Sequence, residues 1–212
     1  MDAARLAGVA IDRALPATGY EADLVEELRA GSEEAFAYLL AVHQHPLYNL
    51  ISYIVEDGTE AADVLQEVFV KVFRGIRQFH GESSLKTWIY RIAVHEASNH
   101  RRGWFRRHLR EAFSLDAPRT DSDRALAGTL ARPETPYQVL EQAERQQIVR
   151  RALASLAQPY RAVVVLREIE GLAYGEIAQV LGVSEGTVKS RLIRGRELLK
   201  RKLTGGLGKR DV

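Results

Sequence analysis

Side chains that can read DNA bases recur near the C-terminal end of the chain. Ser190 and Arg194 are four residues apart, one helical turn, and Ile193 lies beside Arg194. Hydroxyl and guanidinium groups can bind base edges in a major groove, and an isoleucine can contact the methyl group of thymine. Basic neighbours can bind phosphates, which adds affinity without sequence information. The candidate DNA-reading residues are Gly186, Thr187, Lys189, Ser190, Arg191, Ile193 and Arg194.

Two predicted helices place these residues on one exposed face. The first is expected from about Ala173 to Leu181, and Gly182 follows it where a left-handed turn residue belongs. Ser184 stands where an N-cap should open the second helix. The second helix keeps an apolar stripe on its opposite face, made of Val188, Leu192, Leu199 and Leu203. Together these features predict a helix-turn-helix that binds duplex DNA.

A second group of candidate DNA-binding residues precedes and begins a predicted helix from Ser84 to about Arg102. Aromatic and basic side chains alternate there, as a protein that binds an unstacked single strand requires. The group comprises Ser83, Ser84, Lys86, Trp88, Tyr90, Arg91 and His95. The simpler interpretation, without any binding function, is that Trp88 belongs to the core and Tyr90 is a surface tyrosine. Combined with the duplex reader, however, the group favours a protein that opens promoters.

Charge is distributed unevenly although the net charge is only +2. Residues 1–70 carry 3 basic and 13 acidic side chains, whereas residues 71–110 carry 10 basic and 2 acidic ones. Residues 183–212 are basic again, with 9 basic and 3 acidic side chains. Two basic blocks predict two contacts with a polyanion, and the acidic leader predicts a surface kept off DNA.

Several classes of protein are excluded by composition. The chain of 212 residues has no cysteine, which excludes disulfides and thiolate metal sites. No apolar run is long enough to insert in a membrane and no signal-peptide pattern is visible, so a soluble cytoplasmic protein is expected. Glu82 and Glu96 are the only acids in residues 71–110, too few for a persuasive metal pair. We therefore expect no catalytic residues, no metal and no cofactor.

Hydrophobic periodicity predicts an all-α protein of two small helical domains joined by a flexible linker. Ser32 and Thr59 are expected to cap two early helices, Pro46 to kink or interrupt the first of these, and Phe73 to join the core of the second. The expected organisation is an N-terminal extension at 1–20, a domain at 21–102, a linker at 103–136, a helix-turn-helix domain at 137–203 and a tail at 204–212. The basic segment 104–110 within the linker is a further candidate helix.

Four motifs, in this order, resemble bacterial sigma factors of the extracytoplasmic-function group. They are Asp63-Val-Leu-Gln-Glu-Val-Phe, Thr87-Trp-Ile-Tyr-Arg-Ile-Ala, Gly171-Leu-Ala-Tyr-Gly-Glu-Ile-Ala and Gly186-Thr-Val-Lys-Ser-Arg. The resemblance covers roughly residues 21–102 and 137–203. It implies a specificity subunit of RNA polymerase, with a C-terminal helix-turn-helix of the winged-helix-like superfamily.

This resemblance assigns a partner to each surface. The N-terminal domain would bind the polymerase through Asp63, Gln66 and Glu67. The helix from Ser84 and the loop before it would capture the melted minus-ten strand, and the C-terminal helix would read the minus-thirty-five element. An anti-sigma factor is a further implied partner, and a stress or envelope response is the implied role. Many members carry asparagine at the position of His95, so the resemblance does not fix the preferred minus-ten base.

Two alternatives remain open from the sequence. A stand-alone helix-turn-helix regulator would bind its promoter tightly without polymerase, and a DNA-acting enzyme would need a nucleophile or a metal cluster near a basic surface. The charge blocks also predict that the acidic N-terminal domain packs on the basic reading head in the free protein and masks both surfaces.

Overall fold

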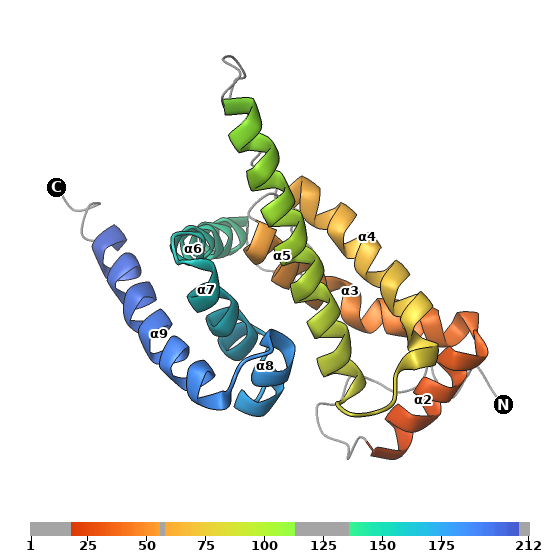
Figure 1. The fold of residues 1–212 in the computed structure, drawn as a ribbon. Coiled ribbons are helices and arrows are strands. Elements are labelled where there is room, and N and C mark those ends of the chain that lie inside the picture. The colour runs from red at the N-terminus through yellow and green to blue at the C-terminus, as the bar shows by residue number, and fades with distance from the viewer. Residues whose placement is uncertain (1–17, 56–57, 113–135, 208–212) are drawn as a thin grey trace.

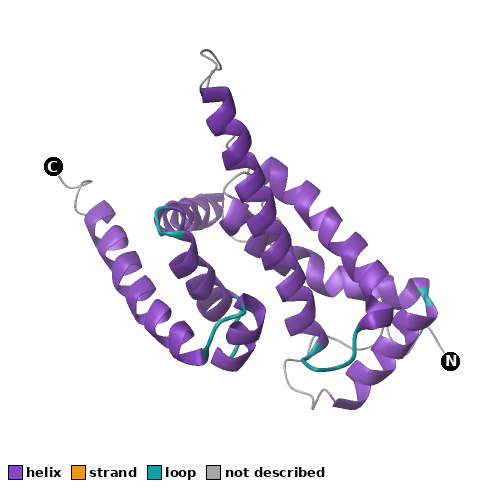
Figure 2. Ribbon diagram, viewed as in Figure 1, coloured by secondary structure: helices purple, strands orange, loops and turns teal. Residues whose placement is uncertain are grey.

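The computed structural model describes residues 18–55, 58–112 and 136–207, and every regular element in these ranges is a helix (Figure 2). The N-terminal helices are α2 (Thr18–Ala30), α3 (Glu33–Val55), α4 (Gly58–Gly75) with the 3-10 turn η1 (Ile76–Gln78), and α5 (Leu85–Ala112). The C-terminal helices are α6 (Pro136–Ala154), α7 (Gln158–Val164), the π-helical η2 (Val165–Ile169), α8 (Tyr174–Leu181) and α9 (Glu185–Leu207). The all-α prediction is confirmed.

Helices α3, α4 and α5 form the N-terminal bundle, against which α2 packs (Figure 1). Its centre consists of fully buried apolar side chains, among them Leu47, Leu50, Val68 and Ile89. The N-terminus of α5 is fixed from two directions. Ser84 Oγ accepts from the Thr87 amide at 3.1 Å, and Glu21 of α2 accepts from the Leu85 amide at 2.7 Å. Acceptors at this end satisfy free amides and complement the helix dipole.

The cap at Ser32 is confirmed, since Ser32 Oγ accepts from the Ala35 amide at 3.2 Å, and the helix predicted from Ser84 has that serine as its N-cap. The cap predicted at Thr59 is wrong, and the interruption predicted as one outcome at Pro46 is absent. Helix α4 begins at Gly58, so Thr59 lies inside it rather than at its cap. Helix α3 continues through Pro46 without interruption, because buried side chains on both sides, such as Leu39 and Leu47, hold the two halves against the same core.

Phe73 was expected in the core, but 59% of its surface is exposed. The inward stripe of α4 is Val64, Leu65, Val68 and Val72, all buried. Phe73 follows Val72 by one residue, or 100° around the helix, which turns its ring away from the bundle and toward Phe36 at 4.8 Å between centroids. An apolar residue beside a buried stripe was therefore mistaken for part of it.

The C-terminal helix-turn-helix is formed by α8 and α9, with α7 packed beneath α9. Ile177, Val188 and Leu192 are buried between them, and Gly182 adopts the predicted left-handed conformation with φ 63°. Gly195 lies where α9 crosses α7, and a Cβ built there would come within 2.7 Å of Val164 Cγ2. Only glycine permits this close approach of the two helices.

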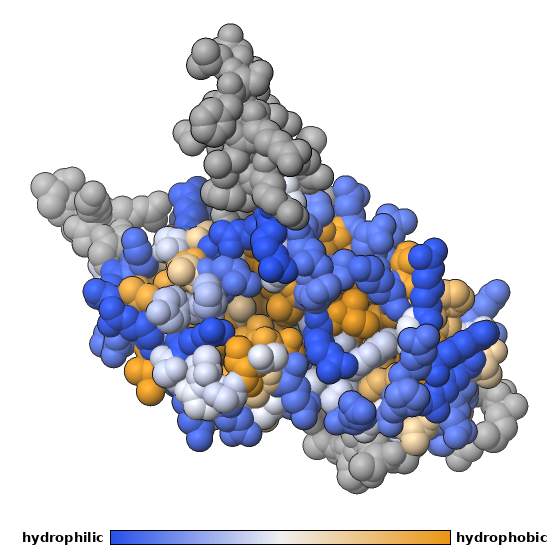
Figure 3. Space-filling view, viewed as in Figure 1, coloured by the Kyte–Doolittle hydropathy of each residue, from blue (hydrophilic) through white to orange (hydrophobic). Residues whose placement is uncertain are grey.

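The two halves of the chain touch one another, with α8 lying beside α5 (Figure 1). Arg161 of α7 is only 2% exposed and donates to the carbonyl of Tyr53 in α3 at 3.0 Å. Arg150 of α6 also lies over the Tyr53 ring, 6.0 Å from its centroid. Hydrophobic surface gathers near this junction, whereas the periphery of the same face is mostly hydrophilic (Figure 3).

Candidate nucleic-acid interface

The reading face of α9 has the geometry that the sequence predicts. Ser184 Oγ accepts from the Thr187 amide at 3.2 Å, which confirms the N-cap and fixes the start of the helix. Val188 and Leu192 are buried on the inner side, whereas Ser190, Arg194 and Ile193 are exposed on the outer side, Ile193 by 61%. Gly186 and Lys189 are also exposed, and Thr187 and Arg191 are half-buried.

The charges around this face are partly paired. Arg194 lies 3.4 Å from Glu197 on the same helix, and both side chains are more than half exposed. Such a pair contributes little and leaves the guanidinium able to exchange partners. Arg196 instead donates twice to one Glu168 oxygen, at 2.6 and 2.9 Å. Arg196 therefore pairs with a residue of η2, whereas the partner of Arg194 lies on its own helix.

The seven candidate strand-binding residues do not share one face. Lys86 and Tyr90, one turn apart, face the C-terminal helices, and Tyr90 is only 1% exposed. Arg91 and His95, also one turn apart, are exposed on another side of α5. Trp88 is half-buried against Phe79, with 5.2 Å between the ring centroids. Ser84 and Ser83, both half-buried, precede the helix.

His95 is held by its neighbours on α5. Its Nδ1 lies 2.9 Å from Glu96 and 3.1 Å from the Asn99 amide nitrogen. Glu96 also binds Lys71 of α4 at 2.6 Å. Burial acts to raise the pKa of Glu96, but the hydrogen bonds from Lys71 and His95 outweigh it and hold that pKa below its usual value. A charged Glu96 thus contacts the exposed histidine ring at the surface.

Three ionisable side chains at the buried side of α5 have shifted pKa values. The Tyr90 hydroxyl donates to Glu170 at 2.7 Å, and burial followed by this hydrogen bond raises the tyrosine pKa. Burial also raises the pKa of Glu170, although Tyr90 and Lys86 partly oppose it. Burial, reinforced by the charge of Lys86, lowers the pKa of His43 in α3 to about 4. These groups are therefore shielded from solvent while the halves of the chain stay in contact.

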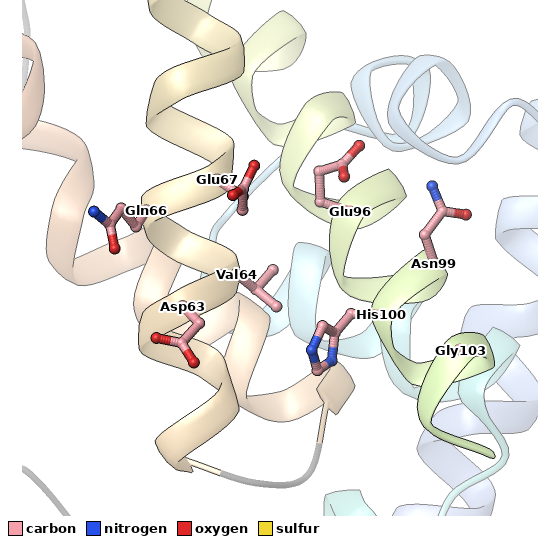
Figure 4. A pocket seen from close by; sticks show the side chains of 8 residues that line it. All are labelled: Asp63, Val64, Gln66, Glu67, Glu96, Asn99, His100 and Gly103. Carbon is pink, nitrogen blue, oxygen red and sulfur yellow. The ribbon is translucent and has the colours of Figure 1, made fainter. Parts of the chain in front are cut away.

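The candidate polymerase-binding residues lie together on α4 and are all exposed. Asp63, Gln66 and Glu67 line a groove of about 570 Å³ between α4 and α5, in which the His100 ring points from α5 toward α4 (Figure 4). Glu96 and Asn99 line the α5 side of the same groove. The sequence prediction missed these three α5 residues, because only the packing of the two helices brings them opposite α4.

Phe73 extends this surface. It lies seven residues after Gln66, two turns along the same side of α4, and its ring meets Phe36 of α3. The sequence holds a signal for this position, because Phe73 follows the polar residues of α4 at helical spacing. Its assignment to the core hid that signal. We call the exposed residues Asp63, Gln66, Glu67 and Phe73 the α4 face.

No group of three His, Asp or Glu side chains in residues 18–55, 58–112 and 136–207 could hold a metal ion. Within the same ranges, no helix is long and apolar enough to cross a membrane.

Comparison with known proteins assigns the family. Residues 39–108 match the family model of sigma-70 region 2, and residues 146–199 match that of sigma-70 region 4. The ECF RNA polymerase sigma-E factor of Escherichia coli (strain K12) is 36% identical over 180 residues, which cover 85% of this chain and 92% of the relative. The chain belongs to the extracytoplasmic-function (ECF) sigma factors. The RNA polymerase sigma-H factor of Pseudomonas aeruginosa shows the same identity over 181 residues, with the same coverage.

Solved structures show the same fold. CnrH in complex with the cytosolic domain of CnrY aligns with a TM-score of 0.62 at 24% identity, covering 87% of this chain and 97% of that one. RpoE in complex with the anti-sigma factor NepR from Bartonella quintana aligns with a TM-score of 0.63 at 22% identity, covering 80% and 96%.

Family membership settles the broad function. An ECF sigma factor is a non-enzymatic subunit that binds core RNA polymerase and directs it to promoter DNA. The stand-alone regulator and the DNA-acting enzyme are therefore set aside.

Proposed function

We propose that three surfaces of this sigma factor divide the work of initiation. The outer face of α9 reads the minus-thirty-five element, α5 with its preceding loop captures the melted minus-ten strand, and the α4 face binds the polymerase. The observation that carries the proposal is the exposure of Ser190, Ile193 and Arg194 over a buried α9 stripe, on a different element from the α4 face. The corresponding domains are residues 21–102 and 137–203, with 1–20, 103–136 and 204–212 as extension, linker and tail.

The family matches and the helices support this division. Region 2 matches residues 39–108, which reach six residues into the proposed linker, and region 4 matches residues 146–199, which lie beyond it. Helix α5 continues to Ala112 and so includes the basic segment 104–110, which was a candidate helix. Of the rest of the proposed linker, residues 113–135 lie outside the described residues, as do 1–17 and 208–212, and Pro136 begins α6.

The direct test is run-off transcription with purified bacterial core polymerase on genomic fragments that include the region upstream of the protein's own gene. Wild-type protein should give promoter-specific transcripts only when both components are present. Potassium permanganate probing of unpaired thymines should show melting at the minus-ten element of the same promoters. Absence of both signals with an active core polymerase would refute the proposal.

Glu67→Lys should impair holoenzyme formation, because it reverses the charge at the centre of the α4 face. Binding of the full-length variant to core polymerase, measured by co-elution or fluorescence anisotropy, should fall at least tenfold, the size expected when a charge pair is replaced by repulsion. Glu144→Lys is the matched control, since it makes the same charge change at an exposed position of α6. Equal binding by Glu67→Lys and wild type would remove Glu67 from the interface.

Arg194→Ala should weaken recognition of the minus-thirty-five element by about 1–3 kcal/mol, the usual range for a residue that contacts bases. Transcription from promoters with substituted minus-thirty-five bases, by holoenzyme containing the variant, would report the change. The variant should discriminate less between bases at one or two positions. Lys200→Ala, which removes an exposed cation six residues further along α9, should reduce activity evenly across all promoters. An unchanged base preference in Arg194→Ala would refute the assigned face.

Two further aspects rest on the family. Membership in the extracytoplasmic-function group supports a role in a stress or envelope response. The resemblance in fold to the sigma factor RpoE in complex with the anti-sigma factor NepR supports an anti-sigma factor as a partner of this chain too. Affinity capture on the full-length protein, repeated with Glu67→Lys, would identify such a partner and show whether its site overlaps the α4 face.

A further inference from the structure

The loop that precedes α5 is held at both ends by one helix, α2. This loop comprises residues 79–84, between η1 and α5, and we call it the capture loop (Figure 1). At its first residue, Arg29 donates from Nη2 to the Phe79 carbonyl oxygen. Directly after its last residue, the Leu85 amide donates to Glu21 Oε1 at 2.7 Å. Two side chains of α2 therefore fix the points where the capture loop begins and ends.

Helix α2 is itself firmly placed. Its buried side chains Leu24, Val25 and Leu28 pack it against α3 and η1. Glu21 and Arg29 lie eight residues apart, which corresponds to about 12 Å along the helix axis. Because a packed helix is rigid over this length, α2 adds a second, inflexible connection between the two ends of the capture loop.

The middle of the capture loop is exposed, whereas its start is buried. His80, Gly81 and Glu82 are exposed, and Gly81 adopts the left-handed conformation with φ 75°. The Phe79 ring is buried and lies 5.2 Å from the Trp88 ring, between centroids. The loop thus has fixed ends and an exposed middle that a nucleotide can reach.

Fixed loop ends favour selective binding. A loop that becomes ordered only on binding loses conformational entropy and therefore affinity, whereas a loop held in advance does not. Both bonds from α2 involve a charged side chain, and such hydrogen bonds are stronger than those between neutral groups. The Glu21 carboxylate also complements the partial positive charge at the N-terminus of α5. These contacts are suited to keeping the loop in one shape.

Glu21 belongs to the acidic N-terminal segment, for which the charge pattern predicts a different contact. The expectation that the acidic N-terminal domain masks the basic reading head is wrong, because Ser190 and Arg194 of α9 are exposed. Glu21 instead lies against the first turn of α5. Helix α2, at Thr18–Ala30, also precedes residues 39–108, which match region 2.

We infer that Glu21 and Arg29 are positioning residues, which hold the capture loop in the shape that discriminates among bases of the minus-ten element. The inference rests on the proposed function, because the loop is assigned there to the melted strand. Neither side chain needs to touch DNA, since each acts through a backbone group at one end of the loop. Loss of either should relax base preference at the minus-ten element and leave the reading of the minus-thirty-five element unchanged.

The first test measures transcription by holoenzymes that contain full-length variants, on templates in which each minus-ten position carries each of the four bases. Glu21→Ala and Arg29→Ala should lower the ratio between preferred and disfavoured bases about fivefold or more at one or two positions. Preference at the minus-thirty-five element should equal that of wild type. Unchanged minus-ten preference in both variants would overturn the inference. An even loss of transcription from all templates would do the same, because the pair would then serve stability alone.

Conservative variants and a matched control accompany this test. Glu21→Gln keeps an acceptor oxygen for the Leu85 amide, and Arg29→Lys keeps a cationic donor, so both should retain most of the base preference. Glu26→Ala removes an exposed acid from the same helix and should change nothing. An equal loss of preference in Glu26→Ala and Glu21→Ala would refute the positioning role, because the charge of α2 would then explain both.

The mobility of the capture loop can be measured without nucleic acid. The chain has no cysteine, so Glu82→Cys gives a single, exposed site in the loop for a nitroxide spin label. Electron spin resonance of the free full-length protein should show a restricted label, and a more mobile one when Glu21→Ala or Arg29→Ala is added. Urea unfolding of the same proteins shows that each variant is folded. Equal label mobility in all of them would contradict the inference.

The outcomes separate the inference from the function on which it rests. Normal promoter melting by the wild-type holoenzyme, with unchanged minus-ten preference in both alanine variants, would overturn the positioning role alone. Absence of melting by the wild-type holoenzyme, whatever the mobility of the loop, would instead overturn the strand-capture function.

Discussion

Phe73→Ala should weaken the binding of this sigma factor to core RNA polymerase by about 2 kcal/mol, roughly a thirtyfold increase in Kd. An aromatic side chain that is 59% exposed in the free protein gains most of its hydrophobic stabilisation only when a partner covers it. Phe73 continues the α4 face two turns after Gln66, and Phe36 supports its ring from α3. This arrangement is that of an apolar anchor beside polar contacts.

The measurement is the Kd of labelled full-length protein for core polymerase, with the free energy of unfolding determined in parallel. Because Phe73 is largely outside the core, Phe73→Ala should change stability much less than affinity. Val149→Ala, which shortens another exposed apolar side chain on α6, is the control and should leave the Kd unchanged. A wild-type Kd for Phe73→Ala would remove Phe73 from the polymerase interface.

Gly195→Ala should destabilise the C-terminal helix-turn-helix by about 1–3 kcal/mol, the usual cost of overpacking. The added Cβ would lie 2.7 Å from Val164 Cγ2 and 3.3 Å from the Tyr160 carbonyl oxygen. Val164 is buried and β-branched, so its methyl group cannot rotate away freely. The helices α7 and α9 must therefore separate, although alanine is otherwise the better helix former.

Gly186→Ala in the same helix is the matched control. Its Cβ would meet nothing nearer than the Ser184 hydroxyl at 3.8 Å, so the free energy of unfolding should stay the same or rise by up to about 1 kcal/mol. Urea unfolding of the full-length variants, followed by circular dichroism, measures both effects. Stability equal to wild type in Gly195→Ala would mean that the α7–α9 crossing is not close in solution.

Local chemistry explains which predictions from the sequence were confirmed. The Ser32 and Ser184 caps, the helix start at Ser84 and the Gly182 turn depend on a few neighbouring residues, and each was read correctly. Helical periodicity placed Val188 inside and Arg194 outside for the same reason, since both faces follow from 100° steps along one helix. The family resemblance also depends on linear motifs, and it too was confirmed.

The sequence alone therefore determined the helices, the reading face of α9 and the family, because these follow from short-range order along the chain. Only the tertiary structure decided that Glu96 and His100 join the α4 groove and that Tyr90 is buried by Glu170. Each of these depends on how helices distant in sequence pack together. The Tyr90–Glu170 bond joins residues 80 positions apart, and no periodicity along one helix can specify such a pair.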